Sequence, residues 1–100
     1  MAQRRALLIG VERYQELPAL VASRADVVRL GSVLGAEEIG GYHVQTLIDP
    51  SADEARRAIA DFFMSAREPD EQRLLYFAGH GLTDSTGRLF LGMTDTRPDL

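Results

Sequence analysis

The sequence predicts an α/β fold in the order β-α-β-α-β, half of a doubly wound, mostly parallel sheet, plus a short strand or hairpin. Three observations support it. Apolar runs without period-two alternation recur at Ala6–Val11, Val44–Ile48 and Leu74–Ala78, as in strands buried on both faces of a sheet. Two amphipathic segments separate these runs. Helical connections of roughly 11–15 residues imply parallel pairing through right-handed crossovers.

The first helix is expected to begin near Ser23 and to end at Gly35. Ser23 stands three residues before Asp26, a capping-box-like start in which aspartate replaces the preferred glutamate or glutamine. Apolar residues then follow at helical spacing: Val27, Leu30 and Leu34. A glycine after the last of them predicts the end of the helix.

The second helix carries the standard form of the capping signature, Ser51 followed by Glu54. Its apolar positions form one stripe: Ala55, Ala58, Ile59, Phe62 and Ala66. Pro69 is expected to lie beyond its end.

The third apolar run, Leu74–Ala78, leads directly into Gly79-His80-Gly81. We expect this run to be a central strand buried on both faces. Glycine on each side lets other chain segments or a substrate approach the histidine closely. Because reacting groups in open α/β sheets gather at the carboxyl ends of the strands, His80 is the leading candidate for chemistry. Polar residues and Gly87 then precede a short strand or hairpin arm, Arg88–Gly92.

The composition limits the classes of function. At 100 residues, with 45% apolar and 26% charged residues, the chain is an ordinary globular domain or part of one. A net charge of −4 gives no reason to expect a nucleic acid or an anionic membrane as partner. The apolar run near the N-terminus is too short for a signal peptide and meets Glu12 at once, so the cytoplasm is the expected location.

All eleven basic residues are arginine, and lysine and asparagine are both absent. We interpret this bias as the codon usage of a GC-rich genome. The chain also contains no cysteine, which excludes a disulfide framework, a thiolate metal site and a thiol nucleophile in this stretch.

Several kinds of site are excluded by missing residues. A phosphate-binding G-x-x-x-x-G-K-[ST] loop needs lysine, and no G-x-G-x-x-G follows the first strand run. Zinc requires three or four protein ligands, whereas the two histidines, His43 and His80, lie far apart in the sequence. His43 begins the second strand run, so we expect it to be solvated at the opposite rim. What remains is His80 as a general acid or base, because imidazole titrates near neutrality.

Three segments carry a family resemblance: Arg5–Val11, Leu75–Gly81 with the letters LYFAGHG, and Gly87–Leu91 followed by Thr94-Asp95-Thr96. In this order they resemble the N-terminal half of a caspase-like cysteine peptidase domain, nearest to bacterial caspase-like proteins and metacaspases. The resemblance covers nearly the whole chain. It implies a peptidase that cleaves protein or peptide substrates through a histidine–cysteine dyad in a bacterial signalling or defence system.

The resemblance also implies roles for three residues. His80 matches the catalytic histidine, and Gly81 matches the glycine whose backbone N–H forms part of the oxyanion hole. Asp26 falls where metacaspases keep an acidic residue that lines the pocket for the substrate's P1 side chain. Capping of the first helix is the alternative role of Asp26, and both roles can hold together.

The family's nucleophilic cysteine follows the next strand, which we expect beyond residue 100. Residues 1–100 are therefore expected to be an incomplete domain that is inactive alone, partnered by the remainder of the catalytic domain or by a second subunit. The rival interpretation is a non-catalytic caspase-like scaffold. With the strand order 2-1-3 of the family, Leu74–Ala78 would lie at an edge of this part of the sheet, and an unpaired apolar edge favours association.

Other polar residues have simpler interpretations. Glu12, Tyr14 and Glu16 lie in the loop after the first strand run, on the same rim as His80. Contact with substrate is one interpretation, and solvation in the loop is the favoured one. Asp84 and Asp95 flank the segment after His80, but two scattered carboxylates are weak support for a calcium site. We predict no metal and no cofactor.

Overall fold

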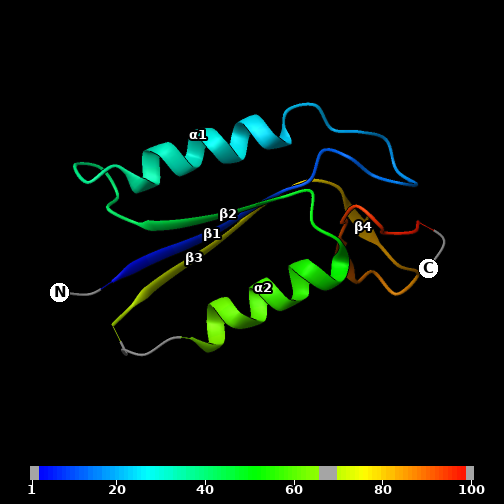
Figure 1. Ribbon diagram of the computed structural model, residues 1–100. Helices are drawn as coiled ribbons and strands as arrows, with labels where there is room; N and C mark the ends of the chain where they lie inside the picture. Colours follow the sequence, from blue (N-terminus) through cyan, green and yellow to red (C-terminus); the bar gives the residue numbers. More distant parts are fainter. Residues whose placement is uncertain (1–2, 66–69, 99–100) are drawn as a thin grey trace.

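The computed structural model describes residues 3–65 and 70–98. Its elements are β1 (Arg4–Gly10), α1 (Ser23–Gly35), β2 (His43–Ile48), α2 (Ala52–Met64), β3 (Gln72–Ala78), β4 (Gly81–Thr83) and β5 (Leu89–Leu91). Figure 1 shows α1 and α2 on opposite sides of the β1–β3 sheet, with the β4 segment beyond one end of it. The predicted α/β fold with the order β-α-β-α-β is confirmed. Ala66 and Pro69, expected at the end of the second helix, lie outside the described residues.

The sheet has the strand order β2-β1-β3 with both pairs parallel. In register, Ile9 of β1 lies between Leu47 of β2 and Phe77 of β3. The carboxyl ends of the strands therefore meet at one rim, as expected for two crossovers through helices. The strand order expected from the family resemblance is confirmed.

The centre of the sheet is β1, not β3. Residues 6–10 of β1 are all buried, and Leu7 and Leu8 have no exposed surface. The prediction that Leu74–Ala78 is a central strand buried on both faces is wrong for the described residues, because β3 pairs on one side only and Leu75 remains 37% exposed. An apolar run without alternation marks a strand covered on its faces, but it does not say how many neighbours the strand has.

Each face of β1 packs against one helix. Leu7, Ile9 and Val11 form a core with residues of α2 and the segment after β5: Ala55, Phe62 and Met93. Ala6 and Leu8 form a second core with Val27 of α1. A Cβ at Gly10 would lie 2.8 Å from Val27 Cγ2, so the glycine that ends β1 permits the close approach of α1.

The two helices begin differently, although their sequences carry similar signals. At α2 the capping box is confirmed, since Ser51 Oγ accepts from Glu54 N at 3.2 Å and Ser51 N donates to Glu54 Oε1 at 2.9 Å. At α1 the prediction that Ser23 caps is wrong. The N-cap is Ala22, whose side chain forms no capping hydrogen bond, and Ser23 is buried as the first helical residue.

Strands β4 and β5 form a separate antiparallel hairpin, as expected for the segment after the histidine. Its turn is organised by Asp84, whose Oδ1 accepts from Thr86 N at 2.9 Å and from Arg88 N at 3.0 Å. Hydrogen bonds from Thr86 and Arg88 hold the pKa of Asp84 below its usual value. Among residues 3–65 and 70–98, no helix has the length and apolar character to cross a membrane.

Candidate functional site

The candidate site lies at the rim where β1 and β3 end. β3 ends at Ala78, two residues before His80, and the loop from Val11 to Ala22 leaves the adjacent end of β1. Val11 N donates to Ala78 O at 2.9 Å, which ties the start of that loop to the end of β3. The first turn of α1 packs over Gly10 at the same rim. The sequence prediction that His80 stands at the carboxyl end of a strand agrees with this placement.

The imidazole of His80 is held by the carbonyl of Pro18, 2.7 Å from Nε2. A carbonyl oxygen only accepts hydrogen bonds, so Nε2 carries a proton and neutral His80 has its lone pair on Nδ1. A group that loses its proton to His80 would therefore approach Nδ1. Pro18, which comes from the loop after β1, was not among the candidate residues predicted from the sequence.

Tyr14 also contacts His80 directly. Its hydroxyl oxygen accepts from His80 N at 2.9 Å, and its ring lies edge-on to the imidazole with centroids 4.7 Å apart and an angle of 62° between planes. The expectation that Tyr14 is simply solvated in its loop is wrong. A Cβ at Gly79 would lie 2.6 Å from the Tyr14 hydroxyl, so the glycine before His80 makes this contact possible.

Burial raises the pKa of Tyr14 above its ordinary value, while the hydrogen bond from the His80 backbone acts in the opposite direction. The phenol therefore stays protonated, and its oxygen serves His80 N as a neutral acceptor at physiological pH.

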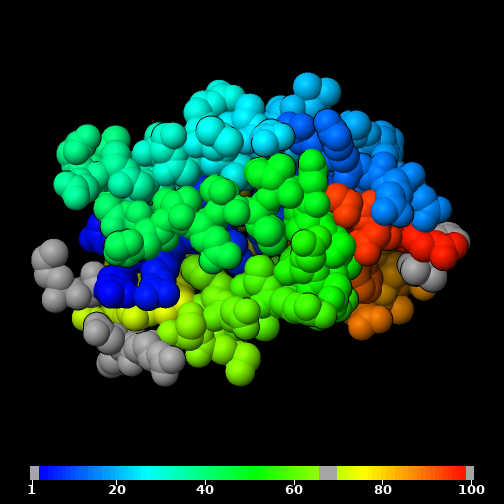
Figure 2. Space-filling model, viewed as in Figure 1, coloured from blue at the N-terminus to red at the C-terminus, as the bar shows by residue number. Residues whose placement is uncertain are grey.

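The loop that carries Tyr14 and Pro18 is anchored to its surroundings at several points. Asp49, in the left-handed region with φ 53°, accepts at Oδ1 from Glu12 N at 2.8 Å and from Arg13 N at 3.1 Å. Gln15 N donates to Thr94 O at 2.9 Å. Figure 2 shows this loop, in blue, lying against the red C-terminal segment.

The two glutamates of the loop have partners, and Glu16 is exposed as expected for a solvated loop residue. Glu12 Oε1 accepts from Arg24 N at 3.0 Å and so supplies, from the loop, the N-terminal hydrogen bond that Ser23 does not give to α1. Glu16 pairs with Arg97 at 3.4 Å. Both contacts hold the loop against neighbouring elements.

Gly81 begins β4, and its orientation follows from the pairing of the hairpin. Gly92 N donates to His80 O at 2.7 Å, and Asp84 N donates to Arg88 O at 3.1 Å. In an antiparallel pair, hydrogen-bonded and non-hydrogen-bonded pairs alternate. Gly81, which pairs with Leu91, therefore belongs to a non-hydrogen-bonded pair. Its N–H points away from β5.

Asp26 lies in the first turn of α1 and is exposed. Its carboxylate is 3.7 Å from Arg29 Nη2, an exposed pair of the kind that contributes little to stability. Since α1 begins at the rim of His80, Asp26 stands at the same end of the sheet as that histidine. The capping partnership with Ser23 that we considered for it is absent at this cap.

The remaining carboxylates near the rim have structural duties. Asp95 Oδ1 accepts from Ala52 N at 2.8 Å at the start of α2, and Asp84 orders the β4–β5 turn. Within the described ranges, no three His, Asp or Glu side chains gather in a way that could hold a metal ion.

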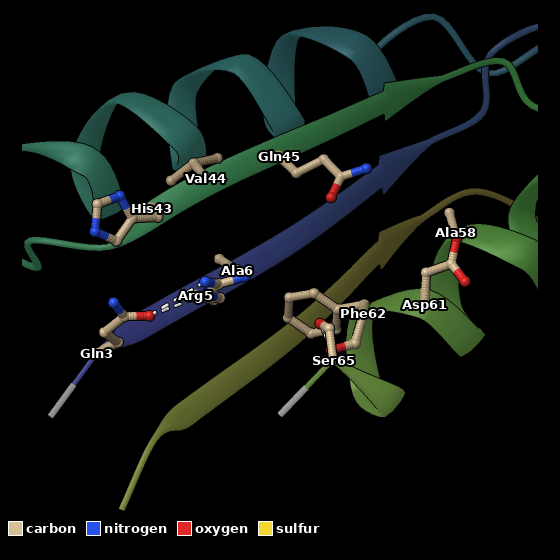
Figure 3. A pocket seen from close by; sticks show the side chains of 10 residues that line it. All are labelled: Gln3, Arg5, Ala6, His43, Val44, Gln45, Ala58, Asp61, Phe62 and Ser65. Carbon is tan, nitrogen blue, oxygen red and sulfur yellow. Dashed lines mark hydrogen bonds between the residues drawn. The ribbon is translucent and has the colours of Figure 1, made fainter. Parts of the chain in front are cut away.

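His43 lies at the opposite rim, as expected. It begins β2, pairs in register with Arg5, and is exposed. Figure 3 shows it beside a cavity of about 470 Å³ between the sheet and α2, where Arg5 donates two hydrogen bonds to Gln3 Oε1. Asp61, Phe62 and Ser65 of α2 line the other wall. None of the residues that contact His80 reaches this cavity.

A second cavity, of about 550 Å³, lies between α2, the hairpin and the segment after β5. Leu82, Phe90 and Met93 give it apolar walls. It adjoins the hairpin that follows His80, and His80 itself is not among its lining residues.

Comparison with known proteins identifies the family. The family model described as the caspase domain matches residues 3–96. The human mucosa-associated lymphoid tissue lymphoma translocation protein 1 is 36% identical over 90 residues, which are 90% of this chain and 10% of that protein. The chain thus spans about a tenth of the length of this curated relative. The chain belongs to the caspase domain family.

Proposed function

We propose that this chain is the histidine-bearing part of a caspase-like cysteine endopeptidase, in which His80 acts as the acid–base group of a histidine–cysteine dyad. The observation that carries the proposal is the contact between Pro18 O and His80 Nε2 at 2.7 Å, which leaves the lone pair of neutral His80 on Nδ1, where it can accept a proton. The chain has no cysteine, so another part of the catalytic domain or a second subunit supplies the thiol.

The proposed reaction is acyl transfer. Nδ1 of His80 takes the thiol proton, and the thiolate attacks the peptide carbonyl to form a tetrahedral intermediate. The imidazolium then gives its proton to the leaving amine, which departs and leaves a thioester that water hydrolyses. The Gly81 N–H, directed away from β5, is suited to donate to the developing oxyanion.

We assign Asp26 to the pocket for the substrate's P1 side chain. The assignment is supported by its place in the first turn of α1, at the rim of His80, and by its exposed carboxylate. A carboxylate discriminates for a cationic partner through charge-assisted hydrogen bonds, so arginine or lysine is the expected P1 residue. Arg24 is also exposed near the start of α1, and it is the competing candidate that would favour an acidic P1 residue.

The second candidate function is a non-catalytic caspase-like scaffold in a signalling assembly. Residues 1–100 contain no cysteine, as both candidates expect, so the residue at the end of the next strand decides between them. A cysteine encoded at the end of the strand that follows this part of the domain favours the peptidase; another residue there favours the scaffold. We further propose a bacterial signalling or defence system as the setting, from the resemblance to bacterial caspase-like proteins; the arginine-only basic composition, typical of a GC-rich genome, is compatible with it.

A peptide library with every residue at P1 tests the function and the specificity together. The protein that includes the cysteine should cleave after arginine or lysine, Asp26→Asn should lose most of this activity, and residues 1–100 alone should cleave nothing. Strong cleavage after aspartate with none after arginine would contradict the role of Asp26. If neither the protein nor any activated form of it cleaves a peptide, the scaffold is supported.

A further inference from the structure

The loop after β1 places the side chain of Tyr14 against His80, and the proposed chemistry gives this tyrosine no role. We propose that Tyr14 is a positioning residue that fixes both the backbone and the imidazole of His80. This inference rests on the proposed function of His80 as an acid–base group, and it adds a residue to that site.

Tyr14 contacts His80 at two separate points. The hydroxyl oxygen accepts from His80 N at 2.9 Å, and the phenol ring lies edge-on to the imidazole with centroids 4.7 Å apart. The first contact fixes the main chain from which the side chain departs, and the second limits rotation of the ring. With Pro18 O bound to Nε2 at 2.7 Å, His80 is held at three points.

Tyr14 is itself held by the core. Its ring packs against the cluster that includes Leu7 and Ile9, the most deeply buried part of β1. The main chain on either side is tied down, by Asp49 Oδ1 to Arg13 N at 3.1 Å and by Thr94 O to Gln15 N at 2.9 Å. A rigid connection therefore runs from the core through the phenol to the imidazole.

The position requires tyrosine rather than another aromatic residue. Phenylalanine would keep the ring contact but would leave the partly buried His80 N–H without its acceptor, and such a group costs free energy when it is unpaired. The hydroxyl also fits a space kept open by Gly79, where a Cβ would lie 2.6 Å from it. Both the hydroxyl and the facing glycine thus serve this one contact.

Nuclear magnetic resonance of the two histidines tests the inference without any assay of cleavage. In protein labelled with ¹⁵N-histidine, the His80 ring of the wild type should give the signals of one tautomer, with the proton on Nε2. Tyr14→Phe should shift these signals toward an average of tautomers, while those of His43, at the opposite rim, stay unchanged. Tyr42→Phe is the matched control, because its hydroxyl lies 3.5 Å from Gln72 Oε1 and it packs on the other core cluster.

Kinetic measurements are the second test of the positioning role of Tyr14. In the active protein, Tyr14→Phe should lower kcat roughly tenfold and Tyr14→Leu roughly a hundredfold, the scale expected when a reacting group loses its alignment. KM should change less than about twofold, because the proposed role of Tyr14 acts through His80 and not through binding of the substrate. Thermal midpoints of Tyr14→Phe and Tyr42→Phe, measured in parallel, separate lost positioning from lost stability.

The outcomes distinguish this inference from the function on which it rests. If the wild-type protein cleaves no peptide, the proposed function fails, and the histidine signals still decide whether Tyr14 positions His80. If Tyr14→Phe matches Tyr42→Phe in the His80 signals and in kcat, the positioning role is overturned. A loss of kcat in Tyr14→Phe that only parallels a fall in thermal midpoint overturns it as well.

Discussion

Strands β1 and β3 have similar sequences and different surroundings. Both are strands of seven residues in which two polar residues precede five apolar or small ones, and each ends at a glycine or beside one. Residues 6–10 of β1 are buried throughout, whereas no residue of β3 is fully buried and Leu75 is 37% exposed. The difference comes from the position in the sheet, since β1 lies between two strands and β3 has one described neighbour.

Stability and chemistry are therefore assigned to different regions: β1 to the core, and the chain after β3 to the site. β1 supplies apolar side chains to both core clusters, while the chain beyond β3 delivers His80 to the rim. The two regions meet through Tyr14, which packs on the cluster of Leu7 and contacts His80.

The largest effect is expected at the open edge of β3. An apolar strand that exposes unpaired backbone groups templates pairing with another chain. We therefore expect residues 1–100 to associate with themselves, or to pair with the remainder of the domain when it is present. Analytical ultracentrifugation over a concentration series measures this. A monodisperse monomer at every concentration that also resists denaturant would contradict an edge available for pairing.

Within the core, Leu7→Ala should lower the free energy of unfolding by about 2–5 kcal/mol, because it removes a fully buried side chain between two neighbours. Leu75→Ala, at the matching position of β3, should cost clearly less, since Leu75 already meets solvent. Phe77, expected to be fully buried, is only partly buried. Phe77→Ala should therefore lower the free energy of unfolding by less than the loss of a fully buried phenylalanine would. Urea unfolding of Leu7→Ala and Leu75→Ala measures the two losses of stability. Equal losses would contradict the difference in burial between β1 and β3.

A smaller loss is expected at the glycine between β3 and His80. Gly79→Ala places a Cβ 2.6 Å from the Tyr14 hydroxyl, and such overpacking costs roughly 1–3 kcal/mol. Gly31→Ala is the control, because its Cβ would meet Leu8 Cδ1 at an ordinary 3.5 Å. In the middle of α1 that change should stabilise by about 0.5–1 kcal/mol. Thermal unfolding of the two variants should therefore shift in opposite directions.

The smallest effect concerns alkaline pH. The pKa of Tyr14 is raised above its ordinary 10.0, so the folded protein holds this proton more tightly than the unfolded chain. The stabilisation is fully present below pH 10.0 and is lost as the pH rises through the raised pKa. Tyr14→Phe should therefore show a shallower loss of stability above this pH than Tyr42→Phe. Parallel slopes for the two variants would show that Tyr14 titrates as it does in the unfolded chain.

The sequence alone was sufficient for features that depend on local signals. Strand and helix order, the capping box of Ser51 and Glu54, and the rim position of His80 follow from periodicity, capping residues and the carboxyl-end rule. The start of α1 was predicted less well. Its Ser23–Asp26 pattern resembles a cap, but Glu12, from twelve residues upstream of Arg24, supplies the hydrogen bond.

Contacts between distant residues could not be predicted in this way. Tyr14 and His80 are 66 residues apart, and Pro18 and His80 are 62 apart. Every residue has a backbone carbonyl, so the sequence does not indicate which carbonyl contacts His80, and the role of Pro18 could not be predicted. For Tyr14 the sequence does hold an indication: a tyrosine follows one buried strand, and a glycine and a histidine follow another. Only the register of β1 against β3 brings the two together.

The most direct test of the account is to measure turnover and thermal midpoint for His80→Ala and Leu7→Ala side by side. In the active protein, His80→Ala should reduce peptide cleavage by roughly 10²–10⁴-fold, the usual contribution of a positioned acid–base group, with little change in midpoint. Leu7→Ala should lower the midpoint and retain turnover at temperatures where it stays folded. Near-normal turnover in His80→Ala, or unfolding as severe as that of Leu7→Ala, would contradict the assignment of chemistry to His80.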